Sequence, residues 1–203
     1  YAGYDRVESG SRLNYGVQWS LYPKNDLPSV QFLFGQSYRL RHEDELTETM
    51  GYHHNLSSYV GRIKVDYKFI TMMYRFRLMQ ENFKAQKNDF VFEIGRDPLR
   101  LGMDYLYQDG YKLGTKMFNK QEEITLYGRS KLTQNWSLEG RYRYNFLKTE
   151  RGPLEASAVL RYDNDCAAVE FEGRKSYTKG RDYKGNSSLS VRLYLKTLGG
   201  IGQ

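Results

Sequence analysis

The chain alternates apolar and polar residues with a period of two, in one stretch after another along its whole length. The last stretch is the most regular, with Leu189, Val191, Leu193 and Leu195 separated by polar residues. Successive side chains of a β-strand point to opposite faces of the sheet, so each stretch predicts one apolar face and one polar face. About ten residues per stretch is also the length of a tilted strand that crosses a bilayer. A half-buried strand of a soluble sheet has the same local pattern, so the length of one stretch does not choose between them.

Eleven stretches of this kind predict eleven strands, at about 11–22, 30–40, 57–67, 69–78, 88–95, 99–108, 121–130, 136–147, 154–162, 166–175 and 187–197. Mostly short connections alternate with mostly longer ones. Charged residues enter only one face, which favours a wet interior opposite lipid over a sandwich core opposite solvent. The predicted fold is therefore all-β, an antiparallel up-and-down transmembrane β-barrel or a part of one.

Composition alone suggests a soluble protein, because 39% of the residues are hydrophobic and the mean hydropathy is −0.75. Barrel strands, however, expose only every second residue to lipid, so averages over a window hide them. No run approaches the roughly 18 consecutive apolar residues of a spanning helix. These observations exclude a spanning helix and leave a barrel possible.

The strand count and the first residues predict that residues 1–203 are a piece of a longer barrel. Bacterial barrels made of one chain have even strand numbers, and eleven is odd. The chain opens on Tyr1 without a signal peptide. We therefore expect this segment to be a fragment of a longer barrel.

The net charge of +7 comes from 31 Lys and Arg against 24 Asp and Glu, but no nucleic-acid-binding motif is present. The basic residues occupy alternate strand positions, so they are expected on one face: Arg62, Lys64, Arg75, Arg77, Arg141, Arg143, Arg192 and Lys196. One interpretation is a solvated interior in which these charges pair across strands with Glu139, Glu170 and Glu172. The other is a conduit for an anionic, phosphate-bearing ligand, and the sequence leaves both open.

Tyrosine is abundant, with 19 copies, and many lie near the ends of the predicted strands: Tyr22, Tyr38, Tyr59, Tyr67, Tyr107, Tyr127 and Tyr162. This placement favours aromatic girdles at the two membrane interfaces. The alternative is the general preference of tyrosine for strands.

No pattern of catalytic or metal-binding residues is found. His42, His53 and His54 lie in or beside the long loop before Ser57. His53 and His54 are adjacent, so on an extended chain they point apart, and with no Cys, Asp or Glu at ligand spacing around them a solvated loop is favoured over a metal site. Motifs for hydrolases, phosphate-binding loops and dinucleotide binding are absent from the sequence. The sequence predicts a protein that is not an enzyme and needs no metal or cofactor.

Two segments resemble a known family. Residues 2–16, AGYDRVESGSRLNYG, are similar to a stretch in the barrel of the lipopolysaccharide-assembly family LptD. The closing segment is similar too, in YDNDC at 162–166, RKSY at 174–177, RDY at 181–183 and LKTLGG at 195–200, and looks most like the alphaproteobacterial branch.

The resemblance implies the C-terminal part of an outer-membrane barrel of about 26 strands, without the N-terminal periplasmic domain and the first strands. It implies that lipopolysaccharide arrives from an LptA-type periplasmic bridge through that domain, passes a polar lumen, and leaves by a lateral gate. An LptE-type lipoprotein would plug the lumen. The competing hypotheses are a small self-contained outer-membrane barrel, acting as an enzyme, adhesin or porin, and a soluble carbohydrate-binding module.

Cys166 is the single cysteine, and it departs from the pair of neighbouring cysteines that the family often carries. It is expected at a strand start after the tight turn at 163–165, either as a small semi-buried residue or as half of a disulfide in the oxidising periplasm. The resemblance implies that its disulfide partner belongs to the N-terminal domain.

Overall fold

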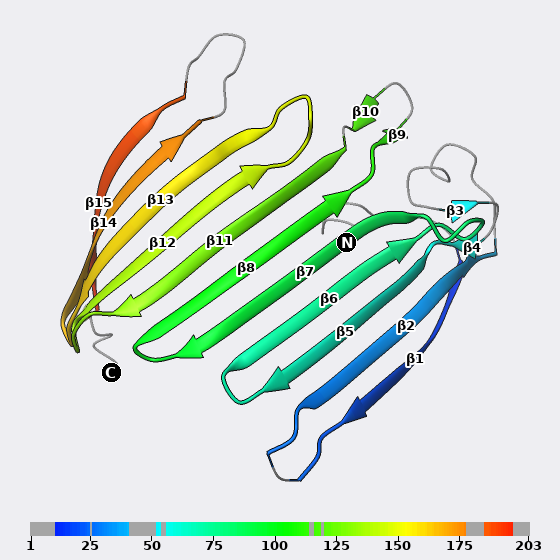
Figure 1. Ribbon diagram of the computed structural model, residues 1–203, viewed down its shortest axis with the longest axis horizontal. Coiled ribbons are helices and arrows are strands. Elements are labelled where there is room, and N and C mark those ends of the chain that lie inside the picture. Colours follow the sequence, from blue (N-terminus) through cyan, green and yellow to red (C-terminus); the bar gives the residue numbers. More distant parts are fainter. Residues whose placement is uncertain are drawn as a thin grey trace, which may run out of the picture. The chain divides into compact units, whose positions relative to one another are not determined.

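A computed structural model describes residues 11–24, 26–40, 52–53, 56–113, 116–118, 120–177 and 185–196. These residues form β-strands joined by turns and loops (Figure 1). No helix long and apolar enough to cross a membrane occurs in the described part of the chain.

Eleven long strands correspond one to one to the eleven predicted stretches. They are β1 (Arg12–Leu21), β2 (Ser29–Arg39), β5 (Tyr59–Tyr67), β6 (Ile70–Leu78), β7 (Ala85–Arg96), β8 (Leu99–Gln108), β11 (Gln121–Lys131), β12 (Trp136–Asn145), β13 (Gly152–Asp163), β14 (Ala167–Ser176) and β15 (Ser187–Leu195). No strand end differs from the prediction by more than three residues. The all-β, up-and-down prediction is confirmed.

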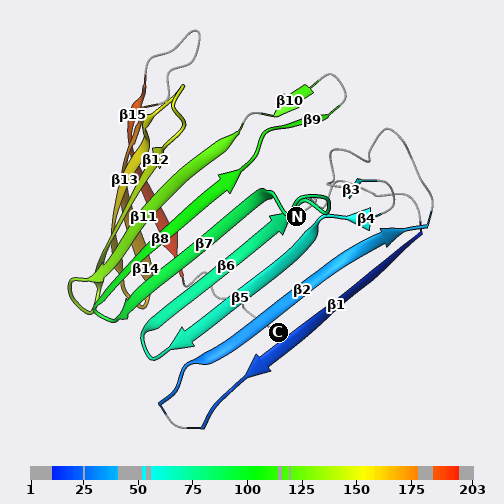
Figure 2. The same ribbon diagram turned by 45° about the vertical axis from the view of Figure 1, so that its right-hand side comes forward.

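The long strands are hydrogen-bonded to their neighbours in chain order, and both views show them side by side in this order (Figures 1 and 2). In the described residues β1 pairs only with β2, and β15 pairs only with β14, so the sheet is not closed. This arrangement agrees with a segment of a barrel wall.

Four short strands were not predicted. β3 (Tyr52–His53) and β4 (Leu56–Ser57) pair with each other, and β9 (Tyr111–Leu113) pairs with β10 (Lys116–Phe118). Each pair lies in a long connection. Two or three residues are too few to show a period of two, which is why alternation did not reveal them.

The registers of β11 to β15 separate two faces. Tyr127 lies opposite Arg141, Arg129 opposite Glu139, and Arg161 opposite Glu170, and these residues belong to what we call the charged face. The positions between them form the apolar face, where Leu126 lies opposite Tyr142, Leu138 opposite Leu160, and Phe171 opposite Val191. Because directly opposed residues of an antiparallel pair point the same way, each face is continuous across these five strands.

Local side-chain bonds fix the short turns. In the β13–β14 turn, Asn164 Oδ1 accepts hydrogen bonds from the backbone N–H groups of Cys166 and Ala167, at 3.0 and 2.7 Å. In the β11–β12 turn, Thr133 Oγ1 accepts one from the backbone N–H of Trp136 at 3.0 Å. Asn and Thr favour such turns because their oxygens replace a backbone acceptor.

A glycine on β8 makes room for a tyrosine of β11. A Cβ added at Gly102 would lie 2.2 Å from Cζ of Tyr127, so the ring lies across the backbone of β8 at this position. The Tyr127 hydroxyl continues past β8 and donates a 2.7 Å hydrogen bond to Glu93 on β7. The tyrosine therefore connects three neighbouring strands, and only glycine at position 102 allows it.

We expect Gly102→Ala to lower the free energy of unfolding by about 1–3 kcal/mol, because the added methyl group displaces the Tyr127 ring. Gly140→Ala is the matched control, because a Cβ at Gly140 meets no atom within 4 Å. The measurement is urea unfolding of the full-length protein in lipid vesicles. Equal effects of the two substitutions would show that the ring does not depend on the glycine.

Candidate functional site: the charged and apolar faces

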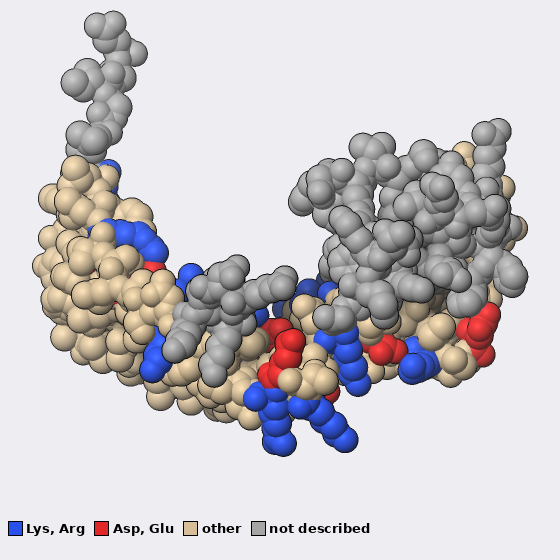
Figure 3. All heavy atoms as spheres, turned by 90° about the horizontal axis from the view of Figure 1, so that it is seen from above, with Lys and Arg blue, Asp and Glu red and all other residues tan. Residues whose placement is uncertain are grey.

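The apolar face is exposed rather than packed against a second layer. Val191 is 61% exposed and Leu189 81% on the edge strand β15, and on the inner strands Leu101 is 50% and Leu126 is 45% exposed. Among the described residues, Ala168 alone is a fully buried hydrophobic residue. At the left of Figure 3, where β13 to β15 lie, uncharged side chains cover one side, and charged atoms show on the other. A sheet without its own core needs an apolar partner over this face.

The charged face of β11 to β15 is largely neutralised by ion pairs across strands. Arg143 binds Glu123 at 2.8 Å, Arg129 binds Glu139 at 2.9 Å, and Arg174 binds Glu155 at 3.1 Å. Each pair joins two neighbouring strands. Arg129 and Glu139 face each other directly and the other two pairs are diagonal, and opposite charges in either position stabilise a sheet modestly.

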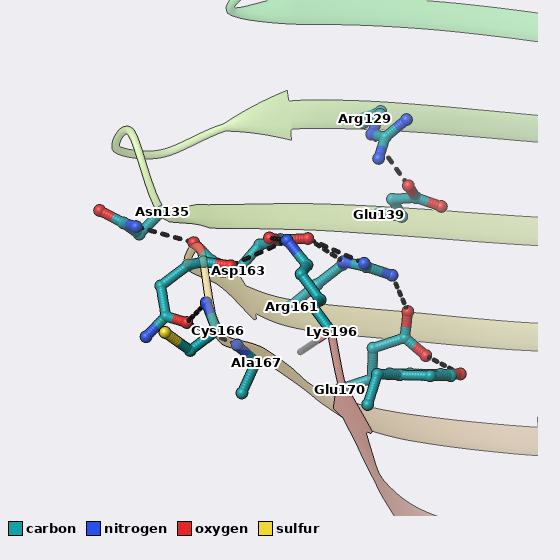
Figure 4. Close-up of polar contacts among 11 residues, drawn as sticks. Arg129, Asn135, Glu139, Arg161, Asp163, Cys166, Ala167, Glu170 and Lys196 are labelled. Carbon is teal, nitrogen blue, oxygen red and sulfur yellow. Dashed lines mark hydrogen bonds and ion pairs between the residues drawn. The ribbon is translucent and has the colours of Figure 1, made fainter. Parts of the chain in front are cut away.

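A larger network joins β13, β14 and the end of the chain's last strand (Figure 4). Arg161 contacts Asp163 at 2.8 Å and Glu170 at 2.6 Å. Lys196 Nζ donates to Asp163 and, at 2.8 Å, to the backbone carbonyl of Asn164. Several charges that share partners bind more firmly than isolated surface pairs, so this network holds the end of β15 against the β13–β14 turn.

Arg192 extends the same network along β15. Its guanidinium contacts Glu172 and lies 3.5 Å from Glu170, while the Tyr194 hydroxyl donates to Glu170 at 2.9 Å. Both carboxylates come from β14. The final strand is thus bound to β14 by charged side chains as well as by its backbone.

The charged face of β5 to β7 differs from this pattern. Arg75 binds Asp89 at 2.7 Å. For Arg62 and Arg77, no ion pair or hydrogen bond to another described residue is found. Positive charge is therefore left unbalanced on these strands.

In the described structure, the eight predicted basic residues fall into two groups, those that pair with carboxylates and those that do not. Arg75, Arg143, Arg192 and Lys196 have carboxylate partners, and Glu139, Glu170 and Glu172 are all bound to arginines, as the pairing interpretation expects. Lys64 is also engaged in a side-chain or backbone contact and is therefore not counted among the residues without a partner. Arg62, Arg77 and Arg141 have no such partner within the described ranges, so the conduit interpretation is still available for them.

Sequence reasoning missed several members of the charged face. Arg161 and Arg174 lie on it by register, opposite Glu170 and Ser157. Alternation could have revealed both, because Arg161 shares the parity of Glu155 on β13 and Arg174 shares the parity of Glu172 on β14. Tyr127, assigned above to an aromatic girdle, instead lies on the charged face opposite Arg141, so that assignment is wrong for this residue.

Cys166 lies in the β13–β14 turn, one residue before β14, rather than at the first strand position. Its side chain is exposed, so the expectation of a semi-buried residue is wrong, and no disulfide partner lies among the described residues. Its backbone carbonyl accepts a 2.9 Å hydrogen bond from the N–H of Lys196. Within the described part of the chain, no group of three His, Cys, Asp or Glu is placed to hold a metal ion, and His42, His54 and the His53 side chain lie outside it.

The β7–β8 turn carries an ion cluster at the short-connection end of the sheet. Lys131 binds Asp97 at 2.9 Å and Arg100 binds it at 3.3 Å. The hydrogen bond from Lys131 is the main cause that lowers the pKa of Asp97 below its ordinary value of 3.8, and Arg100 adds to it. The carboxylate is therefore ionised at neutral pH.

We expect opposite results when the same charged residue is placed on the two faces of β15. Val191→Arg should destabilise the full-length protein in lipid by about 2–4 kcal/mol if this position lies near the bilayer midplane, because an arginine is costly against hydrocarbon. Ser190→Arg, opposite Glu172 on the charged face, should change the stability little. Refolding into lipid vesicles with urea titration measures both. Equal losses would contradict the assignment of the faces.

We also expect a small stabilising effect of Asp97 that depends on pH. A carboxyl whose pKa is lower in the folded than in the unfolded state stabilises the fold above its unfolded pKa. The stabilisation is lost as the pH falls through the folded pKa, below 3.8. Comparing wild type with Asp97→Asn by urea unfolding at several pH values should show a difference at pH 7 that disappears in acid. A difference that is constant with pH would refute it.

Comparisons with known proteins agree with this geometry. The family model LptD, described as LPS transport system D, matches residues 1–136. An LPS-assembly protein LptD of Vibrio vulnificus is 23% identical over 90% of this chain and 24% of its own length, and one of Chromobacterium violaceum is 23% identical over 100% and 25%. One from Nitrosococcus oceani is 36% identical over 42% of this chain and 11% of its own length.

The chain thus spans about a quarter of the length of the curated relatives it matches. The family model covers more than half of the chain, including β1, β2 and β5 to β8. With its antiparallel sheet and its two chemically opposite faces, this chain belongs to the LptD family of lipopolysaccharide transport proteins.

Proposed function

We propose that this chain is part of the outer-membrane barrel of a lipopolysaccharide translocon. Its apolar face lies against lipid and its charged face lines the lumen. The observation that carries the proposal is an exposed apolar face, without a core of its own, backed by a charged face in a chain of the LptD family. Strands that pair their backbone groups with neighbours and expose apolar side chains are what a bilayer accepts.

The chemistry of the two faces supports a transport role without catalysis. Lipopolysaccharide joins acyl chains to phosphorylated sugars, so its movement to the outer leaflet requires a polar route for the sugars and contact with hydrocarbon for the chains. The charged face offers guanidinium groups, which bind phosphate by charge-assisted hydrogen bonds. In this proposal the protein is not an enzyme. It binds and guides its substrate.

By similarity to the family, the partners would be an LptE-type lipoprotein within the lumen and an LptA-type bridge that reaches an N-terminal periplasmic domain. The ion pairs of β11 to β15 are suited to a wall against which another protein packs, because few of their charges are left unbalanced. Short connections would face the periplasm and long connections the exterior.

Photo-crosslinking in cells tests the proposed route. A photoreactive amino acid in place of Arg141, an exposed cation of the charged face, should trap lipopolysaccharide or the partner lipoprotein. The matched position is Leu195, an exposed residue of the apolar face at the short-connection end of β15, which should trap only membrane lipid. Membrane lipid as the product at both positions would overturn the proposal.

Cys166 gives a second test, of the link to an N-terminal domain. The exposed thiol lies on the short-connection rim, which this proposal places in the oxidising periplasm. We expect full-length protein from cells to change its mobility on reduction, and Cys166→Ser to abolish the change. Complete labelling of Cys166 by a thiol reagent in denatured, unreduced protein would show that no disulfide forms.

A further inference from the structure

The charged face of β5, β6 and β7 carries five lysines and arginines against three carboxylates, and two of these carboxylates, Asp66 and Glu93, lie toward the short turns. Between residues 60 and 65, 73 and 78, and 85 and 89, this face carries Arg62, Lys64, Arg75, Arg77 and Lys87 against Asp89 alone. All six lie in one compact unit of the chain. Since the strands from β11 onward balance similar charges with glutamates, this excess is a local property of β5 to β7.

Like charges lie opposite each other on β5 and β6. The ring of Phe76 lies over Gly61, where an added Cβ would be 2.1 Å from its Cζ, so the two residues are opposed. The next pair along the two strands is Arg62 and Arg75. Like charges directly opposite on a sheet destabilise it, unless an anion lies between them.

A second such pair lies beside the first, on β6 and β7. The backbone N–H of Gly95 on β7 donates a 2.9 Å hydrogen bond to the carbonyl of Phe69 before β6, an alignment that sets Arg75 opposite Asp89, to which it is bound. Two positions further along, on the same face, Arg77 lies opposite Lys87. For Lys87, as for Arg77, no carboxylate partner is found in the described residues.

Arg75 also retains an unused donor. Its Nη2 binds Asp89, but its Nε is buried and has no hydrogen-bond partner within the described structure. Buried guanidinium donors normally find an acceptor, and one left unpaired is costly. An anion with several oxygens, placed over β6, would supply the missing acceptor.

We propose that Arg62, Arg75, Arg77 and Lys87 form an anion site that takes the phosphate groups of a phosphorylated sugar. Residues two apart on a strand are about 7 Å apart and facing residues about 5 Å, so these four long side chains reach one phosphate. Guanidinium groups bind phosphate through paired hydrogen bonds. The identification of the sugar as part of lipopolysaccharide rests on the proposed function, whereas the anion site itself does not.

Binding to the purified full-length protein tests the site. The probes are inorganic phosphate, lipopolysaccharide, and lipopolysaccharide freed of its phosphates, measured by calorimetry. Arg77→Gln and Lys87→Gln remove cations without leaving a carboxylate unpaired, and each should weaken phosphate binding about tenfold. Lys148→Gln, which removes the same charge from the exposed β12–β13 connection, should change it less than twofold.

Each outcome decides one point. Equal effects of Arg77→Gln and Lys148→Gln, or equal binding of lipopolysaccharide with and without phosphates, would overturn the anion site even if crosslinking at position 141 traps lipopolysaccharide. Phosphate binding that depends on Arg77 would support the site even if that crosslinking fails. A protein adduct, with no lipopolysaccharide, from a photoreactive residue at position 77 would identify an acidic polypeptide as the occupant and overturn the proposal.

Discussion

Register is the constraint on which the rest of this structure depends. A slip of one residue between two strands would move every leucine of one strand to the charged face and every arginine to the apolar face. The cross-strand ion pairs oppose such a slip, because Arg129 lies directly opposite Glu139 and Arg161 directly opposite Glu170 in the observed alignment. In a single-layer sheet without its own core, these pairs replace part of the specificity that core packing gives to a globular domain.

The number of long strands and their approximate ends could be predicted from the sequence, because a period of two persists over about ten residues in each. Short pairs such as β3 with β4 could not be predicted in this way, since they contain too few residues to show a period. Some observed strand ends differ from the predicted ones because a side chain in the turn binds backbone groups there. At Asn164, for example, the side chain binds the N–H of Cys166 and delays the start of β14.

The partners of the charged side chains could not be predicted from the sequence. Alternation indicates that Arg143 and Arg141 share a face, but only the register of β11 against β12 shows that Glu123 reaches the first and that Arg141 faces Tyr127. The same holds for the excess charge on β6, which appears only when the facing positions of its two neighbours are known. Tyr127 was misjudged because its nearness to a strand end was used to assign it, whereas its face follows from its alternation with Arg129 and its position opposite Arg141.

The tyrosine that crosses β8 also has a mechanical consequence. Tyr127 belongs to β11, its ring lies over the backbone of β8 at Gly102, and its hydroxyl binds Glu93 of β7, so one side chain links three strands. Sliding β8 along its neighbours would bring Arg100 or Asp104 under the ring, and neither leaves room for it. Sliding of β8 between β7 and β11 is therefore opposed by side-chain sterics as well as by the backbone hydrogen bonds of the sheet.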